Sequence, residues 1–143
     1  MIVVDTNIIA YLYLPTQQTE SIERLLSADP NWVAPPLWRS EMRNILATYL
    51  RSEILGFETA CNIQHQAELL MGDNEYKIDS ITVLTLAKKS GCSAYDCEFI
   101  ALAMSLDTVL ITADKKLLAS FPTAAMCAAD YPGSLDIPNL PSS

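Results

Sequence analysis

The sequence predicts an α/β fold of three layers, in which a central, mostly parallel sheet of about five strands is flanked by helices. Short apolar runs rich in β-branched residues alternate along the chain with longer segments of helical periodicity, which is the pattern of a parallel sheet. The chain has 143 residues, enough for one domain with a substantial core. Hydrophobic residues make up 50% of it, which argues against a disordered chain. We therefore expect a single domain over residues 1–143.

The first segments predict a strand, two helices and a second strand. Ile2–Val4 is short and continuously apolar, as expected of a strand buried on both faces. Residues 7–14 are apolar enough for a buried helix, which Pro15 ends. Thr19–Ala28 has helical spacing of its apolar residues, and residues 32–34 predict a short second strand.

The middle of the chain predicts two long helices. One spans about residues 38–54 and is ended by Gly56. The other spans Phe57–Met71 and is closed by Gly72. Because the connection between them is so short, we expect them to pack antiparallel. Residues 75–78 give a weak signal for a third strand.

Residues 81–89 are ambiguous, because they alternate like a strand but end in two lysines and a glycine, which is typical of a helix end. We predict a helix there. The remaining predictions are a helix over residues 95–106, a strand over 108–112, a helix over Lys115–Ser120, a last strand over 124–128 and an irregular, proline-rich tail from about residue 129.

Composition limits the classes of function. The chain has 9 basic and 17 acidic residues, for a formal net charge of −8. That charge is a poor match for duplex nucleic acid, although bound cations or a basic protein partner would offset it. The N-terminus carries Asp5 early and lacks the positive leader of a signal peptide, and no apolar run approaches the roughly 20 residues that span a bilayer. We expect a cytoplasmic protein with no membrane contact.

The cysteines and the single histidine indicate no zinc site and no catalytic triad. Cys61, Cys92, Cys97 and Cys127 are widely spaced and form no Cys-x-x-Cys pair, so we interpret them as reduced thiols. His65 lies in the middle of a predicted helix without metal-ligating or catalytic partners nearby, and we expect it on the surface.

Four acidic residues stand where strands end or helices begin: Asp5, Glu41, Asp96 and Asp114. Ligands of open parallel sheets bind beyond the carboxyl ends of the strands, where Asp5 and Asp114 fall. Carboxylates gathered at such an edge repel one another unless a hard cation joins them, and oxygen-only ligand sets favour Mg²⁺ or Mn²⁺. A metal held in this way can activate water against a phosphodiester.

Each of these residues also has a plainer explanation. Asp5 and Asp114 suit the N-cap of the helix that follows each of them. Asp96 stands three residues after Ser93, the spacing of a capping box. Glu41 suits the positive end of its own helix. Taken singly, the structural and the functional interpretation of each residue are about equally favoured.

Three neighbouring charged residues are weaker candidates. Glu98 lies two positions from Asp96 and so points to a different helix face, which makes it a secondary ligand candidate. Arg39 and Arg43 flank Glu41 at helical spacing and suit either a phosphate grip or a solvated face. We favour the solvated face.

Taken together, the segments around the four acidic residues resemble the motifs of PIN-domain nucleases, in order and spacing, from Met1 to about Ser120. The short chain is most similar to the VapC-type toxins of toxin–antitoxin pairs. The matching segments are Val4-Asp5-Thr6-Asn7, Glu41 in a helix after the second strand, Ser93-Ala94-Tyr95-Asp96 with residues 99–103, and residues 110–117 around Asp114.

This resemblance implies Mg²⁺- or Mn²⁺-dependent hydrolysis of RNA by metal-activated water, with a 5′ phosphate left on the product. It implies a small antitoxin as partner and a homodimer. It carries Asp5, Glu41, Asp96 and Asp114 over as catalytic residues, with Asp5, Asp96 and Asp114 as metal ligands and Asn7 and Thr112 as polar supports. The alternative is a catalytically inactive PIN-like module that binds RNA or a protein.

Overall fold

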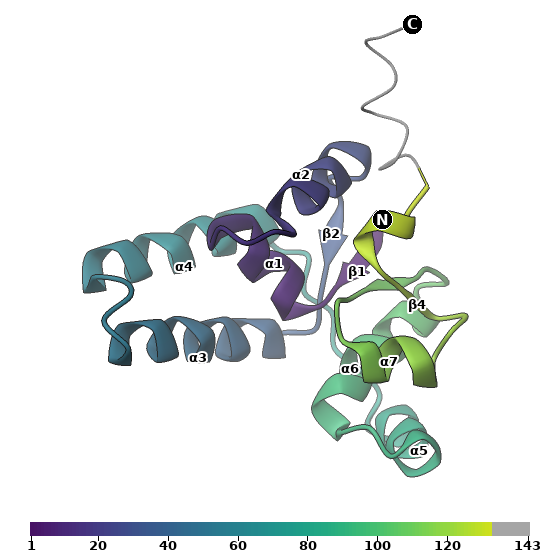
Figure 1. Ribbon diagram of the computed structural model, residues 1–143. Coiled ribbons are helices and arrows are strands. Elements are labelled where there is room, and N and C mark those ends of the chain that lie inside the picture. The colour runs from purple at the N-terminus through teal and green to yellow at the C-terminus, as the bar shows by residue number, and fades with distance from the viewer. Residues whose placement is uncertain (133–143) are drawn as a thin grey trace, which may run out of the picture.

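The computed structural model describes residues 1–132 and has an all-parallel sheet of four strands in the order β2-β1-β3-β4 (Figure 1). The two central strands are in register, with Val3 opposite Leu110 and Val4 opposite Ile111. All four strands are short because each carries only two or three ladder residues before the chain turns toward a helix. Their bounds are Ile2–Val4 for β1, Trp32–Val33 for β2, Leu110–Ile111 for β3 and Ala125–Met126 for β4.

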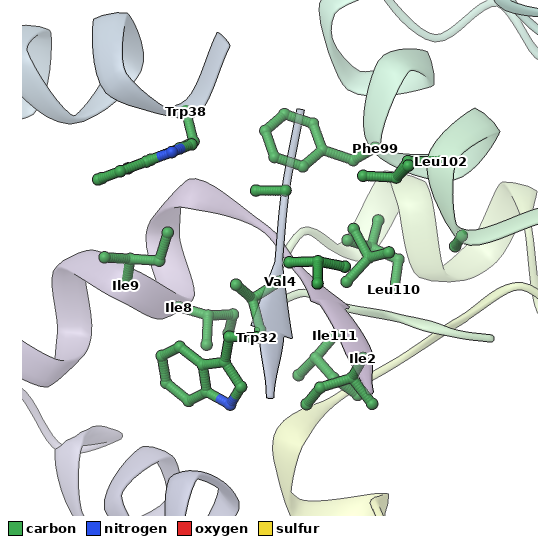
Figure 2. Close-up of a cluster of buried hydrophobic side chains, with 14 of the residues drawn as sticks. Ile2, Val4, Ile8, Ile9, Trp32, Trp38, Phe99, Leu102, Leu110 and Ile111 are labelled. Carbon is green, nitrogen blue, oxygen red and sulfur yellow. The ribbon is translucent and has the colours of Figure 1, made fainter. Parts of the chain in front are cut away.

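Helices cover the sheet on both faces, which confirms the predicted α/β class. Ile8 and Ile9 of α1 lie on one side of the strands, and Phe99 and Leu102 of α6 lie on the other (Figure 2). All four side chains are at most 1% exposed. The helices that form these layers are α1 (Thr6–Tyr13), α2 (Thr19–Ala28), α6 (Ala94–Ser105) and the short α7 (Lys115–Ser120).

Two long helices form an antiparallel hairpin that extends to one side of the sheet (Figure 1). They are α3 (Leu37–Arg51) and α4 (Phe57–Met71), and their antiparallel packing was predicted. The predicted end of α3 at residue 54 was wrong: Ser52 is its C-cap, and Glu53 turns the chain with a left-handed φ of 58°. Gly56 does not end α3 but stands at the N-cap of α4.

The predicted strand over residues 75–78 is reduced to one bridge between Ala34 and Glu75. The sheet therefore has four strands, plus this single bridge where a fifth was expected. The ambiguous segment 81–89 is helical, as predicted: α5 spans Ser80–Ser90 and packs on α6. A short 3-10 helix, η1, occupies Ala128–Asp130 in the predicted irregular tail, of which residues 133–143 lie outside the described part of the chain.

The core consists of buried side chains from the sheet and from the helices that pack on it (Figure 2). Trp32, Trp38 and Phe99 are fully buried, and every residue of β1 is at most 1% exposed. Burial of each such large apolar side chain contributes roughly 1.5–3 kcal/mol. This packing places the carboxyl ends of β1 and β3 side by side, which positions the residues that follow them.

Candidate active site

The residues that follow β1 and β3 meet at the carboxyl edge of the sheet. Val4 is in register with Ile111, so Asp5 and Thr112, the next residue of each strand, are neighbours. A hollow of about 390 Å³ opens at this edge. Its walls include all four predicted acidic residues, which come from four distant parts of the chain: Asp5, Glu41, Asp96 and Asp114.

Asp5 is held in place by hydrogen bonds to both carboxylate oxygens. Its Oδ1 accepts from the backbone N–H of Thr6 at 2.8 Å, and its Oδ2 accepts from the Thr112 hydroxyl at 2.7 Å. The first bond makes Asp5 the N-cap of α1, as its plainer interpretation predicted. Burial raises its pKa from 3.8 to about 6, against the lowering effect of both hydrogen bonds and with a further increase from the charges of Glu41 and Asp96.

Thr112 links Asp5 to Asp114. Its hydroxyl donates to Asp5 and accepts from the backbone N–H of Asp114 at 3.0 Å, and its side chain is fully buried. Asp114 caps α7 through one oxygen only, since Oδ1 accepts from the N–H groups of both Lys116 and Leu117. The capping role predicted for Asp114 is therefore confirmed, and its second oxygen is outside the cap.

Thr6 is a site residue that the sequence interpretation missed. Its hydroxyl donates to Glu41 Oε1 at 2.7 Å, while its backbone N–H donates to Asp5. One residue therefore orients two carboxylates. The only signal for it was its place between Asp5 and Asn7 in the first motif. Burial raises the pKa of Glu41, and the charge of Asp96 raises it further.

Asp96 enters the hollow from the first turn of α6 and is half-buried. Its backbone N–H donates to the Ser93 hydroxyl at 3.1 Å, so Ser93 is the N-cap that was predicted. Within residues 1–132 the reciprocal bond of a capping box, from Ser93 N–H to the Asp96 carboxylate, is not formed. Burial raises the pKa of Asp96, the charge of Asp114 raises it further, and the Ser93 hydroxyl and Lys116 lower it.

Asn7 and the two arginines contribute less than these groups. Asn7 lines the hollow, but in the described part of the chain its side chain makes no hydrogen bond, so its predicted supporting role stays a prediction. Arg39 is turned away into ion pairs with Glu68, at 3.0 Å, and with Glu75. Arg43 is exposed and is not part of the hollow's wall. Neither arginine therefore forms a phosphate grip here.

The donor set suits a hard divalent cation. The polar side chains in the wall of the hollow carry carboxylate, hydroxyl and amide oxygens, which Mg²⁺ and Mn²⁺ prefer. Among residues 1–132, no three carboxylate, histidine or cysteine side chains already stand in the arrangement of a metal-binding group. Mg²⁺ usually binds one or two carboxylates directly and keeps several waters, so acidic groups spread around one hollow can hold such an ion partly through its waters.

Both the sequence and the fold of this chain are similar to those of known proteins. The family model described as PIN domain matches residues 2–121. Ribonuclease VapC3 of Pyrobaculum aerophilum is 30% identical over 134 residues, which cover 85% of this chain and 95% of that protein. The crystal structure of FitAcB from Neisseria gonorrhoeae is 19% identical and has a TM-score of 0.68, over 92% of this chain and 100% of the other, which shows a shared fold.

Proposed function

Because this chain belongs to the PIN-domain family, as its motifs predicted, we propose that it is a metal-dependent endoribonuclease and the toxin of a toxin–antitoxin pair. One observation carries the proposal. Four carboxylates from distant segments line one hollow at the edge of a parallel sheet, and burial and mutual repulsion raise the pKa values of three of them: Asp5, Glu41 and Asp96. Such perturbed groups in a cleft are typical of a functional site.

Asp5, Asp96 and Asp114 are the residues that would hold the cation. A bound Mg²⁺ or Mn²⁺ would lower the pKa of water and stabilise negative charge on the phosphate. Thr6 and Thr112 keep Asp5 in one orientation. That fixed orientation favours in-line attack on a bound phosphodiester, because misplacement of reacting groups by about 1 Å is costly.

Glu41 is suited to accept the proton of the attacking water. The Thr6 hydroxyl holds its Oε1, which leaves Oε2 for the proton. Its raised pKa makes it a stronger base than an exposed glutamate. The water oxygen bonds to phosphorus as the P–O bond to the 3′ oxygen breaks, and the departing 3′ oxygen takes a proton from solvent. The product carries a 5′ phosphate, and no covalent enzyme intermediate forms.

The acidity of the chain bears on its partners. The net charge is −8, and among residues 1–132 the wall of the hollow contains no lysine or arginine. RNA therefore binds weakly unless cations offset the repulsion. A small antitoxin with a basic segment would complement the same surface. We further propose a homodimer, which light scattering on the eluted peak of a sizing column would test.

Total cellular RNA with Mn²⁺ provides the direct test of the nuclease. We expect cleavage by the wild type, and loss of at least about a hundredfold in Asp5→Asn and Asp96→Asn, the scale seen when one group that stabilises a transition state is removed. Asp73→Asn, at an exposed position outside the hollow, is the matched control and should keep full activity. Sequencing of the cut ends would give the cleavage sites. Full activity in both site variants would refute the assignment.

An inactive binding module is the second candidate, favoured by the lack of a ready three-ligand group in residues 1–132. A thermal melt with Mn²⁺ separates the two. A cation that binds only the folded protein raises the midpoint by mass action. We expect a rise in the wild type and a smaller one in Asp5→Asn. No rise in the wild type, with RNA or protein binding retained, would favour the module.

A further inference from the structure

A second hollow adjoins the catalytic one and has no role in the mechanism above. It encloses about 530 Å³, compared with about 390 Å³ for the catalytic hollow. It lies between the start of α3, the segment before α5, α5 itself and α6. Leu37 belongs to the walls of both hollows, so the two hollows adjoin at this side chain.

The wall of the second hollow is largely apolar, with a few charged and polar groups among its residues. Ile78, Val83 and Leu84 supply apolar surface, and Leu84 is 64% exposed, which leaves a face for a ligand to cover. Lys77, Ser80 and Glu98 supply the charged and polar groups. Within residues 1–132 none of these three side chains makes a hydrogen bond or an ion pair. Apolar walls with a few unpaired polar groups are the usual make-up of a ligand pocket.

Glu98 connects this hollow to the chemistry. It lies on α6 two residues after Asp96, so Asp96 faces the catalytic hollow and Glu98 faces the second one. Glu41 is near enough to Glu98 for the two charges to repel each other. A chain of RNA with its scissile phosphate beside Asp96 would therefore place an adjacent nucleotide over Leu37 and next to Glu98.

We propose that the second hollow binds the base of a nucleotide that flanks the scissile phosphate, and that Glu98 selects guanine there. This inference rests on the proposed nuclease function. Sequence-specific proteins read single-stranded RNA by splaying out a base and bonding its Watson–Crick edge. The two carboxylate oxygens accept, and guanine alone offers two adjacent donor groups on that edge, N1–H and N2–H₂. Among residues 1–132, Lys77 is the one cation in the wall, and it would bind the guanine O6 or a neighbouring phosphate.

Cleavage of a short RNA with a randomised segment, followed by sequencing of the ends, tests the base preference. We expect guanine to be enriched at one position beside the cut for the wild type. In Glu98→Gln the guanine preference should fall about tenfold, the scale of one bidentate base contact. Glu58→Gln, an exposed glutamate on α4, is the matched control and should keep the preference. Cleavage with no preferred flanking base, or with the preference intact in Glu98→Gln, would overturn the proposal.

A binding measurement separates failure of the subsite from failure of the nuclease. Methyl resonances of Ile78, Val83 and Leu84 in the full chain are followed in EDTA, with guanosine monophosphate and with uridine monophosphate as probes. We expect the guanosine compound to shift these methyl groups and the uridine compound to shift them much less, with the difference lost in Glu98→Gln. These shifts in a protein that cleaves no RNA would retain the base site and reject the nuclease. Equal or absent shifts would reject the base site and would favour a side chain of a partner protein as the occupant of the hollow.

Discussion

The two sides of the acidic hollow are held in different ways. On the strand side, both oxygens of Asp5 accept hydrogen bonds, from Thr6 and Thr112, and the side chain is only 7% exposed. On the helix side, Asp96 is half-buried, and in the described part of the chain its carboxylate accepts no bond from a backbone N–H. The strand side thus fixes a position, whereas the helix side supplies charge in a more hydrated setting.

This difference has an energetic consequence. The fold raises the pKa of both carboxyls mainly by burial, so ionisation of either one costs more free energy in the folded protein than in water. The effect is larger for the more deeply buried Asp5. A divalent cation offsets this cost, because it stabilises the charged carboxylates. Stability without metal therefore reports on the site independently of activity, and the strand side should respond most.

The largest effect we predict is on the pH dependence set by Asp5. Its pKa is 3.8 unfolded and about 6 folded, so its stabilising contribution is complete below pH 3.8 and is lost as the pH rises to about 6. The shift corresponds to about 3 kcal/mol. We expect the free energy of unfolding of the wild type, relative to Asp5→Asn, to fall by about this amount between pH 4 and pH 7. Urea unfolding in EDTA at several pH values measures it.

Asp29 provides the control with opposite sign. Burial raises its pKa, but the hydrogen bonds it accepts from the N-terminal amine, Asn31 and Tyr131, together with the charge of that amine, lower it by more, so the net pKa is lowered. Its stabilising contribution is therefore lost as the pH falls. The wild type relative to Asp29→Asn should therefore gain stability as the pH rises. If Asp5→Asn shows the same direction as Asp29→Asn, burial among other carboxylates does not raise the pKa of Asp5.

Removal of the Thr112 hydroxyl tests the hydrogen bond that holds Asp5 on the strand side. Thr112→Val keeps the shape but leaves a buried oxygen of Asp5 and the N–H of Asp114 without their partner. We expect a loss of about 1–3 kcal/mol in the free energy of unfolding. Mn²⁺-dependent cleavage should fall about 10- to 100-fold, as it does when groups that orient metal ligands are removed.

Thr108→Val is the matched control for that variant. The Thr108 hydroxyl donates to the Met1 carbonyl at an exposed position, away from the hollow. Its removal should cost less stability than Thr112→Val and should leave cleavage unchanged. Equal effects of the two substitutions would show that Thr112 has no special relation to Asp5.

The sequence predicted the acidic residues better than the groups that orient them. Asp5 and Asp114 are visible in the sequence because each ends an apolar run and precedes a helix. The Thr6 hydroxyl contacts Glu41, which is 35 residues away in the sequence, and the Thr112 hydroxyl contacts Asp5, which is 107 residues away. No local pattern encodes such contacts. Thr112 was named only through the family motif, and Thr6 was missed.

The errors in the fold have a similar origin. Residues 75–78 were expected to form a strand, but only Glu75 pairs, with Ala34, and its carboxylate accepts from the Trp38 indole and pairs with Arg39. Those side-chain partners lie on α3, so tertiary contacts decided the conformation of this segment. The end of α3 was misplaced because Glu53 takes a left-handed φ that favours glycine. In contrast, α2, α4 and α7 have the predicted bounds. Local signals suffice for them: helical periodicity and flanking breakers for α2 and α4, which have no side-chain cap among the described residues, and the Asp114 cap for α7.

A smaller effect is predicted for Asp114, where the capping role and the charge are separable. Asparagine is as good an N-cap as aspartate, so Asp114→Asn should keep the bonds to Lys116 and Leu117 and change stability little. Asp114→Ala should cost about 1 kcal/mol through loss of the cap. Both should lower Mn²⁺-dependent cleavage. Thermal or urea unfolding together with the cleavage assay would show whether stability and activity separate in this way. Full activity in Asp114→Asn would remove Asp114 from the metal ligands.

The smallest change in stability is expected for substitution of Asp96. It is also the change that best distinguishes the two sides of the hollow. Its pKa is raised, so its charged form costs stability at pH 7, but its partial exposure makes that cost smaller than the cost for Asp5. In EDTA, Asp96→Asn should be as stable as the wild type or slightly more stable. Any gain in stability should be smaller than the gain in Asp5→Asn. Glu58 also lies in the first turn of a helix but is exposed and outside the hollow, so Glu58→Gln should lose about 0.3–1 kcal/mol of favourable interaction with the helix dipole. Urea unfolding at pH 7 compares the two. A loss in Asp96→Asn that matches the loss in Glu58→Gln would mean that Asp96 serves its helix and not the cluster, because only repulsion among the gathered carboxylates gives the two substitutions opposite signs.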